Sequence, residues 1–261
     1  MQSTRASCGV PVIRAFRSKS PVAFTLSVTF TPSLSMLKLY IANKNYSSWS
    51  LRPWVLTREL GIPFQEELVP FGQGGGAQGF GSFSPSGKVP CLVDGPVVVW
   101  DSLAIVEYLA EGHAGVWPSD ALARAWARSA AAEMHSGFAN IRNVCTMNCG
   151  LRVQLAAPSS QLISEWDRID TLWQEGLSRF GGPFLAGSRF TAVDAFFAPL
   201  AFRVQSYSPS LSPISSSYCQ RLLQLPGMQQ WYGAALQEPW RDPEHEDEAR
   251  AAGTWLQDLR Q

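Results

Sequence analysis

The spacing of apolar residues divides the chain into two parts of different character. Up to Trp117-Pro118, short apolar runs of strand type alternate with stretches of helical period, which is typical of a mixed α/β unit. Beyond that point apolar residues recur only every three or four positions, as they do along amphipathic helices. The pattern therefore predicts an α/β domain over residues 36–117, followed by an all-helical domain over residues 118–261.

The first domain is expected to hold four strands and two helices, in the order strand, helix, strand and then strand, strand, helix. These elements are Leu37–Ala42, Leu51–Leu60, Phe64–Phe71, Val89–Val93, Val97–Trp100 and Ser102–Ala110. Asp94-Gly95 is a strong hairpin-turn signal, and Pro53 fits the first turn of an amphipathic helix. The stretch Gly72–Gly81 is expected to be a flexible loop, because it lacks the Lys-Ser/Thr ending of a phosphate-binding loop. This order of elements is the one that a thioredoxin-like domain requires.

In the second domain, two regular stripes predict the core-facing sides of helices. They comprise Leu122, Trp126, Ala130, Met134 and Phe138, and then Leu162, Trp166, Ile169, Trp173, Leu177 and Phe180. Thr191–Asp194 has the form of a helix N-terminus with a structural capping role. Ser206–Ser217 is rich in Ser and Pro and is expected to interrupt the helices. The charged tail Glu244–Leu259 is expected to be a helix with a solvated face.

Composition narrows the class of protein. With 46% hydrophobic and 16% charged residues, the chain can bury a core and is not disordered as a whole. No apolar run approaches the roughly 18 residues that a membrane span needs, so no membrane partner is expected. The five cysteines do not suit a disulfide framework, and the three histidines lie too far apart for a metal site. No basic, aromatic-rich cluster beyond the N-terminal segment indicates a nucleic-acid partner.

Charge is unevenly distributed along the chain. The 21 Lys and Arg residues balance 21 Asp and Glu residues, but no acid precedes Glu59, and four of the early bases lie in residues 1–35. This acid-free leader is rich in Ser and Thr and has the composition of an organelle transit peptide, which predicts a mitochondrial or chloroplast location. The other two interpretations are a disordered tail before a true start at Met36, with a cytoplasmic protein, and a secretory signal. All three leave residues 1–35 outside the folded domains.

Three short segments of the first domain carry a family resemblance. They are Tyr46–Trp54 after the first strand, Pro85–Pro90 before the third strand, and Trp100–Ile105 before the last helix. In this order and spacing they resemble the glutathione-binding segments of a cytosolic-type glutathione S-transferase, of the serine type found in bacterial-like and zeta-like members. With Glu133–Phe138 and Thr191–Asp194, the resemblance covers about residues 36–240. It implies the glutathione transferase fold, a homodimer with a detoxifying activity, and glutathione as co-substrate with no other cofactor and no metal.

The resemblance also assigns glutathione-binding residues. It implies a cis peptide bond before Pro90, which turns the Val89 backbone outward, beside Lys88, to pair with the glutathione backbone as an added strand. It further implies that Asp101 and Ser102, at a helix N-terminus, hold the γ-glutamyl carboxylate and ammonium. From the residues alone, the same segments are an ordinary strand start and a helix N-cap, and both interpretations stay open here.

Ser47 is the candidate catalytic residue, with Ser48 beside it. Both lie between the first strand and the first helix, where the positive end of the helix points. A thiol with a pKa of about 8.5 is mostly protonated at pH 7, and one serine hydrogen bond with one helix end is enough to favour the thiolate. The alternatives are that the two serines only cap the helix, or that Tyr46 supplies the hydroxyl.

One position departs from the thiol-disulfide branches of the family, which place cysteine in this turn. The matching residue is Trp49, so a mixed-disulfide mechanism has no nucleophile there. The second substrate is expected between the domains, against Trp49, Met134, His135 and Phe138, although His135 also suits a helix-packing role. The main hypothesis is conjugation of glutathione to small electrophilic substrates. The alternatives are glutathione-dependent cis–trans isomerisation, as in the zeta branch, and a non-catalytic binding module of the same fold.

Overall fold

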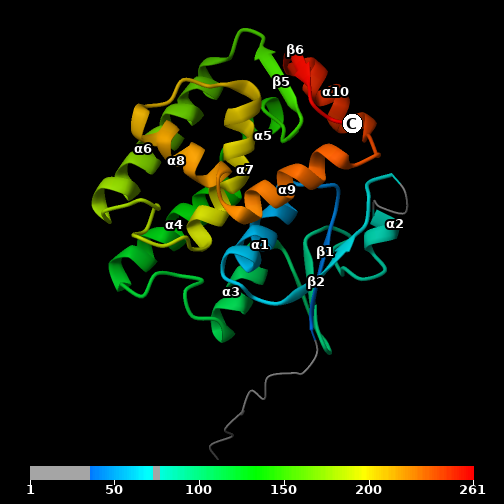
Figure 1. The fold of residues 1–261 in the computed structure, drawn as a ribbon, viewed down its shortest axis with the longest axis vertical. Helices are drawn as coiled ribbons and strands as arrows, with labels where there is room; N and C mark the ends of the chain where they lie inside the picture. The colour runs from blue at the N-terminus through cyan, green and yellow to red at the C-terminus, as the bar shows by residue number, and fades with distance from the viewer. Residues whose placement is uncertain (1–35, 73–76) are drawn as a thin grey trace, which may run out of the picture. The chain divides into compact units, whose positions relative to one another are not determined.

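The computed structural model describes residues 36–72 and 77–261 (Figure 1). The predicted leader, residues 1–35, lies outside the described residues, as do residues 73–76 of the predicted glycine-rich loop. The described remainder of that loop contains a short helix, α2 (Ala77–Phe80), so the expectation of a loop throughout the stretch is wrong. Over the described ranges, no helix has the length and hydropathy needed to cross a membrane.

A four-stranded mixed sheet forms the first part of the fold. It consists of β1 (Leu37–Ile41), β2 (Phe64–Leu68), β3 (Cys91–Asp94) and β4 (Val97–Trp100), in the spatial order β2-β1-β3-β4. β2 runs parallel to β1, whereas β3 is antiparallel to β1 and to β4, as the thioredoxin-like order requires. Because Asp94 still belongs to β3, the hairpin loop is Gly95-Pro96, one position later than expected. Gly95 has a φ of 55°, a conformation that favours glycine.

Helix α1 (Ser48–Glu59) connects β1 to β2 and is buried on nearly all sides. Its neighbours are β1, α3 (Ser102–Gly112), α7 (Ala192–Tyr207) and α9 (Pro226–Gln237). Every side chain from Ser50 to Thr57 is buried, so the expectation of a one-sided amphipathic helix is wrong. The helix also begins three residues earlier than expected, which moves Pro53 beyond the first turn.

The second part of the fold is mainly helical. Its other helices are α4 (Ala121–Ser136), α5 (Ala139–Val144), α6 (Ser160–Arg179), α8 (Pro213–Leu223) and α10 (Pro243–Ala252). It is not all-helical, because β5 (Leu151–Leu155) pairs antiparallel with β6 (Gly253–Asp258). The predicted tail helix Glu244–Leu259 therefore ends at Ala252 and continues as a strand whose backbone groups find partners in β5. Its face is not fully solvated either, since Glu246 is buried.

The two predicted core stripes have different outcomes. On α6, the stripe from Leu162 to Leu177 is buried as expected. On α4, Ala130 and Met134 of the predicted stripe are buried as expected, and so is Phe138 just beyond the helix, whereas Leu122 is 69% exposed and the further buried positions are Ala123, Ala127 and Ala131. Small alanine side chains let a neighbouring helix approach closely, and α4 packs against α7 along this face. The stripe therefore predicts the inner side of the C-terminal half of α4, whereas Leu122 at the start of the helix is wrongly assigned to it.

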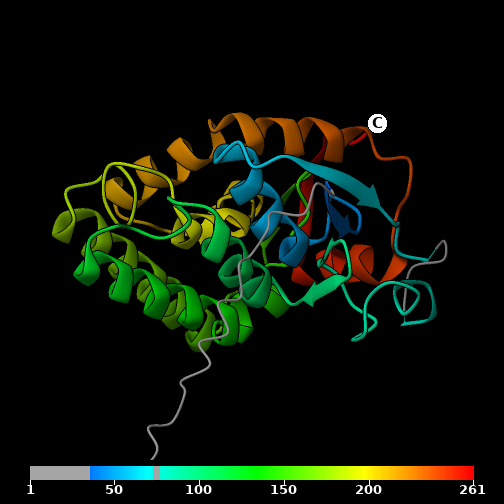
Figure 2. The ribbon, with the colours of Figure 1, turned by 90° about the horizontal axis from the view of Figure 1, so that it is seen from below.

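Helix α7 lies in the middle of the helical elements in both ribbon views (Figures 1 and 2). Its N-terminus is fixed as predicted by Thr191 and Asp194, because the Asp194 carboxylate accepts the Thr191 backbone N–H at 2.9 Å. The same carboxylate accepts the Leu185 N–H at 3.0 Å and the Tyr218 hydroxyl at 2.9 Å. Burial nevertheless raises the pKa of Asp194 to about 6. This cap fixes the start of α7 and therefore the position of the helix.

Candidate active site

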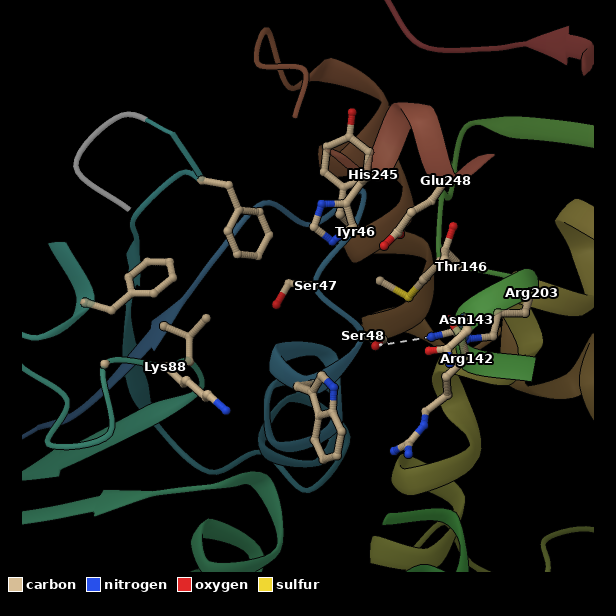
Figure 3. Close-up of a pocket in the computed structure, with 16 residues that line it drawn as sticks. Tyr46, Ser47, Ser48, Lys88, Arg142, Asn143, Thr146, Arg203, His245 and Glu248 are labelled. Atoms are coloured by element: carbon tan, nitrogen blue, oxygen red, sulfur yellow. Dashed lines mark hydrogen bonds between the residues drawn. The ribbon is translucent and has the colours of Figure 1, made fainter. Parts of the chain in front are cut away.

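A cavity of about 510 Å³ opens at the N-terminal end of α1 (Figure 3). One side, here called the serine wall, is formed by Tyr46, Ser47, Ser48, Trp49, Lys88 and Val89. The other side, here called the helical wall, is formed by Arg142, Asn143, Thr146, Arg203, His245 and Glu248. Five residues that the sequence places in the site, Ser47 to Trp49 together with Lys88 and Val89, therefore meet in one cavity.

Ser47 occupies the N-cap position of α1, but its side chain makes no capping hydrogen bond to the helix backbone. Its hydroxyl donates instead to the Ser50 hydroxyl at 2.7 Å. The Ser47 hydroxyl faces the cavity, between Lys88 and the helical wall (Figure 3). The interpretation that Ser47 only caps the helix is therefore not supported. Ser50, which the sequence reading did not single out, is a polar partner one turn along the helix.

The turn that presents Ser47 is held by a residue from the far end of the chain. The Glu238 carboxylate accepts the Lys44 N–H at 2.6 Å and the Asn45 N–H at 3.1 Å. The Ser47 N–H donates to the Asn43 carbonyl at 2.8 Å. Burial raises the pKa of Glu238, although the two N–H donors oppose this. Buried backbone donors need such partners, so Glu238 fixes the turn before α1.

Tyr46 lines the cavity with its ring, but its hydroxyl is already occupied. It donates to the Glu246 carboxylate at 2.7 Å and lies 3.3 Å from the Arg260 guanidinium. Glu246 and Arg260 form an ion pair with each other. Burial and the Glu246 carboxylate raise the pKa of Tyr46. This network makes Tyr46 a poorer source of the catalytic hydroxyl than either serine.

The segment expected to pair with the glutathione backbone immediately precedes β3, which begins at Cys91, two residues later than expected. The Val89-Pro90 peptide bond is cis, as the resemblance implied. Val89 is half-buried and lines the cavity, Lys88 is exposed at its rim, and Pro90 is buried beneath them. Lys88 and Val89 are therefore the members of this segment that line the cavity together with Ser47.

Asp101 and Ser102 do not line this cavity, but each is connected to the lining residue Trp49 through one intermediate residue, His135 or Arg52. Asp101 caps α3 by accepting the Leu103 N–H at 2.8 Å and has a φ of 76°, a strained conformation for a residue with a side chain. Its other oxygen lies 3.5 Å from His135 Nε2. Ser102 is fully buried and accepts a hydrogen bond from Arg52 at 3.3 Å.

Trp49 connects these residues to the cavity. Its ring lies edge-on to His135 at 5.1 Å between ring centroids, and the Arg52 guanidinium lies 4.1 Å from its centroid. Burial, with Arg142 and Arg203 nearby, lowers the pKa of Arg52 to about 9. Burial also lowers the pKa of His135, although Asp101 opposes this.

The residues expected to hold a second substrate are divided by the structure. Trp49 lines the cavity, whereas Met134 and Phe138 are buried in the hydrophobic core. His135 is half-buried between Asp101 and Trp49 and does not line the cavity. Met134 is on the buried side of α4, which packs against α7. Its side chain therefore belongs to the core and does not line the cavity.

The helical wall contains residues that sequence reasoning missed. Arg142 is on α5, Arg203 is on α7, and His245 and Glu248 are on α10. His245 Nδ1 lies 2.6 Å from Asp242, and its ring stacks on Phe71 at 5.2 Å between centroids. None of these residues belongs to a contiguous motif, so only the fold brings them together. Over the described ranges, no cluster of His, Cys, Asp and Glu is suited to a metal ion.

The arrangement suits the binding of a small anion beside a hydroxyl. Ser47 presents a hydroxyl at the positive end of α1, and Val89, next to the cis peptide bond before Pro90, lines the same cavity. Arg142, Arg203 and Lys88 are cations, and Glu248 is the sole carboxylate among the lining residues that the structure describes. A thiolate placed here would therefore meet hydrogen-bond donors and positive charge.

Comparison with known proteins agrees with this geometry. The family descriptions "Glutathione S-transferase, N-terminal domain" and "Glutathione S-transferase, C-terminal domain" match residues 46–111 and 153–234, together more than half of the chain. The chain is 25% identical over 218 residues to the glutathione S-transferase-like protein OpS6 of Beauveria bassiana, which covers 79% of this chain and 93% of that relative. It is 29% identical over 134 residues to a probable maleylacetoacetate isomerase of Caenorhabditis elegans, which covers 50% of this chain and 62% of that relative.

A solved structure shares the fold. A glutathione transferase homologue from Burkholderia GL BGR1, determined with bound glutathione, matches with a TM-score of 0.58 at 21% identity, over 77% of this chain and 98% of that one. The thioredoxin-like part, the helical part and their order are the same as those expected from the sequence. The chain belongs to the glutathione S-transferase family.

Proposed function

We propose that this protein is a glutathione transferase that ionises the glutathione thiol with the Ser47 hydroxyl and conjugates the thiolate to small electrophilic substrates. The observation that carries the proposal is the Ser47 side chain, which occupies an N-cap position without capping the helix and faces the cavity. Its proton, which the Ser50 hydroxyl accepts, becomes available to an anion bound at the end of α1 when that hydrogen bond reverses.

The energy required is within reach of this geometry. Lowering a thiol pKa of about 8.5 by two units corresponds to about 2.7 kcal/mol of preference for the thiolate. A hydrogen bond to a charged group contributes about 1.5–3 kcal/mol, and a helix N-terminus adds about 0.3–1 kcal/mol. Ser47 and the end of α1 together supply this amount without a general base. The Ser50 hydroxyl can reverse its hydrogen bond and donate to Ser47, which frees the Ser47 proton for the thiolate.

Ser48 is less well placed for the same role. Its hydroxyl oxygen accepts a hydrogen bond from Arg203 at 3.4 Å, so it is directed toward the helical wall (Figure 3). The Tyr46 hydroxyl is held by Glu246 and Arg260, neither of which lines the cavity. Among the three candidate hydroxyls, Ser47 is therefore the one proposed to contact the thiol.

The test compares the two serines. Ser47→Ala is expected to lower kcat/KM for conjugation of glutathione to a chlorodinitrobenzene by about 10- to 100-fold, since one charged hydrogen bond is lost. Glutathione binding, measured by calorimetry, is expected to survive, because other contacts hold the peptide. Ser48→Ala serves as the matched control and is expected to lose much less activity. Undiminished turnover in Ser47→Ala would exclude the assignment.

A second candidate function is glutathione-dependent cis–trans isomerisation, favoured by the relative named as a probable maleylacetoacetate isomerase. The two reactions differ in the fate of glutathione, because a transferase consumes it and an isomerase regenerates it. The assay supplies a cis-alkene diacid in large excess over glutathione. Complete conversion to the trans isomer indicates isomerisation, whereas conversion that stops when glutathione is exhausted indicates conjugation.

We also propose a homodimer. β4 leaves Val97, Val98 and Trp100 exposed, and Val98 and Trp100, with Leu103 and Ala104 of α3, line an apolar surface. Such a surface is unusual on a monomer. Sedimentation is expected to give twice the chain mass for the wild-type protein and the single chain mass for Trp100→Glu. Monomeric wild-type protein would contradict the proposal.

A further inference from the structure

The helical wall of the cavity contains two arginines without an acidic partner. Arg142 on α5 and Arg203 on α7 both line the cavity. Among the residues that the structure describes, neither forms an ion pair with a carboxylate. Glu248, the carboxylate of this wall, is exposed to solvent. We call Arg142 and Arg203 the arginine pair.

Arg203 is buried and its hydrogen bonding is incomplete. Its Nη1 donates to the Cys145 carbonyl and, at 3.5 Å, to the Arg142 carbonyl, while Nη2 lies 3.4 Å from the Ser48 hydroxyl. Its Nε is buried without a partner. Burial lowers the pKa of Arg203 to about 10, and the nearby Arg142 adds to this, whereas Tyr207, Cys145 and Glu248 oppose it. The group remains charged at neutral pH, since this pKa is still well above 7.

Arg142 is held in place but keeps donors available. Its Nη1 donates to the His135 carbonyl at 3.1 Å, and its guanidinium lies 5.5 Å from the centroid of the Trp49 ring. Stacking on an aromatic ring fixes the plane of a guanidinium. A guanidinium has five N–H donors, so one carbonyl contact leaves most of them free at the half-buried position of Arg142.

A purely structural role accounts for only part of this arrangement. The carbonyl contacts explain why each arginine has one Nη directed at a helix end. They do not explain two cations on a cavity wall whose described carboxylate, the exposed Glu248, forms an ion pair with neither of them, because a buried charge without a paired counter-ion is costly. An anionic ligand group would remove that cost and satisfy the remaining donors.

We propose that the arginine pair is a binding subsite for a carboxylate of the second substrate, so that the enzyme prefers electrophiles that carry a carboxylate. This inference rests on the proposed function and specifies its substrate class. Trp49, Val89, Phe71 and Phe80 provide apolar cavity surface for the body of such a molecule. The glutathione carboxylates are expected at Lys88 and Asp101–Ser102, which belong to the thioredoxin-like part, so the arginine pair remains for the other substrate.

The experiment uses a matched pair of electrophiles. These are a chlorodinitrobenzoate and its methyl ester, which has no negative charge and carries one additional methyl group. Each kcat/KM is divided by the uncatalysed rate with glutathione, which removes the difference in intrinsic reactivity. The wild-type enzyme is expected to prefer the carboxylate by at least about tenfold, since charge-assisted hydrogen bonds are the strong ones.

Variants at Arg142 locate the preference. In Arg142→Met, kcat/KM for the carboxylate is expected to fall at least about tenfold more than for the ester, mainly through KM for the electrophile. Arg142→Lys, which keeps the charge without the fork of donors, is expected to retain part of the preference. Arg179→Met on α6 removes an exposed arginine that does not line the cavity, so it serves as the control.

The outcomes separate this inference from the proposed function. No preference in the wild-type enzyme, or an equal loss on both substrates in Arg142→Met, would overturn the inference and leave conjugation intact. If neither electrophile is turned over, the proposed function has failed, and calorimetry with the unchlorinated dinitrobenzoate and its methyl ester decides instead. Tighter binding of the carboxylate that is lost in Arg142→Met then supports the subsite, and equal binding of the two overturns it.

Discussion

The serine wall and the helical wall of the cavity are assembled in different ways. The serine wall comes from two short segments, residues 46–49 and 87–89, both in the thioredoxin-like part. The helical wall comes from α5, α7 and α10, which are separated by long stretches of chain. The first wall carries the chemistry proposed for the thiol, and the second carries the charge proposed to select the electrophile. The difference indicates that one wall can be recognised from local motifs and the other only from the fold.

The two walls also rest on different buried carboxylates. Asp194 fixes the N-terminus of α7, which carries Arg203. Glu238 fixes the turn that carries Ser47. Substitutions at these carboxylates are therefore expected to disturb one wall at a time.

The largest effect is expected from Asp194→Ala. Removing the carboxylate leaves the Leu185 and Thr191 N–H groups and the Tyr218 hydroxyl without their acceptor in the core. We expect the free energy of unfolding to fall by about 3–5 kcal/mol, because each unsatisfied buried donor costs about 1–3 kcal/mol. Urea denaturation measures this loss, with the exposed Asp247→Ala on α10 as control. A loss no larger than that of the control would contradict the role of Asp194.

The same residue predicts a pH dependence. Burial raises the pKa of Asp194 to about 6, above the ordinary value of about 3.9. Between these values the folded state holds more protons than the unfolded state, so the contribution of Asp194 to stability falls as pH rises from about 4 to about 6 and is constant above that. The difference in unfolding free energy between the wild-type protein and Asp194→Asn, measured across this range, is expected to show that slope. A flat difference would contradict it.

Glu238→Gln is expected to have the next largest effect and to act on the serine wall. A glutamine side chain has one acceptor oxygen, so one of the Lys44 and Asn45 N–H groups loses its partner. We expect a loss of about 1–3 kcal/mol in unfolding free energy and a lower kcat with glutathione, because the position of Ser47 is less fixed. The preference for the carboxylate electrophile is expected to remain. If that preference falls with kcat, the two walls are not independent.

Tyr46→Phe tests whether the Tyr46 hydroxyl, rather than the Ser47 hydroxyl, contacts the glutathione thiol. The lost hydrogen bond to Glu246 is expected to lower stability by about 1–2 kcal/mol. Turnover is expected to change by less than about threefold, because the Tyr46 hydroxyl is directed away from the proposed thiol site. A loss of activity as large as that of Ser47→Ala would transfer the catalytic role to Tyr46.

The smallest effect is expected from a substitution of Lys88, at the rim of the cavity. Lys88 is exposed and forms no hydrogen bond among the described residues, although it lines the cavity. Lys88→Ala is expected to raise KM for glutathione by about two- to fivefold through one lost exposed charge, with kcat unchanged. The effect is expected to weaken at high salt, because exposed charges are screened. An effect on kcat alone would place Lys88 closer to the reacting atoms than the rim.

The sequence predicted what depends on local spacing. The order of strands and helices along the first part follows from short runs and turn signals, and the α6 stripe from Leu162 to Leu177 follows from helical period. Leu122 was misplaced because the inner side of α4 is set by close contact with α7, a partner that a local pattern does not reveal. β6 was missed because its partner, β5, lies about a hundred residues earlier in the chain.

The residues of the site also divide into those that a local motif predicts and those that only the fold brings together. Ser47, Ser48 and Val89 were predicted because each lies in a motif with a recognisable position in the fold. Arg142 and Arg203 were not, because a single arginine on a helix gives no local signal of a site. Only their burial without a carboxylate, seen in three dimensions, distinguishes them from surface arginines.

The titration of the bound glutathione thiol tests the central claim most directly. Thiolate absorbance of the enzyme–glutathione complex is followed against pH for the wild-type protein, Ser47→Ala and Ser48→Ala. We expect the wild-type complex to titrate one to two units below the value of about 8.5 for a free thiol, Ser48→Ala to stay close to the wild type, and Ser47→Ala to return toward the free value. The same lowered pKa in Ser47→Ala as in the wild type would contradict activation of the thiol by Ser47.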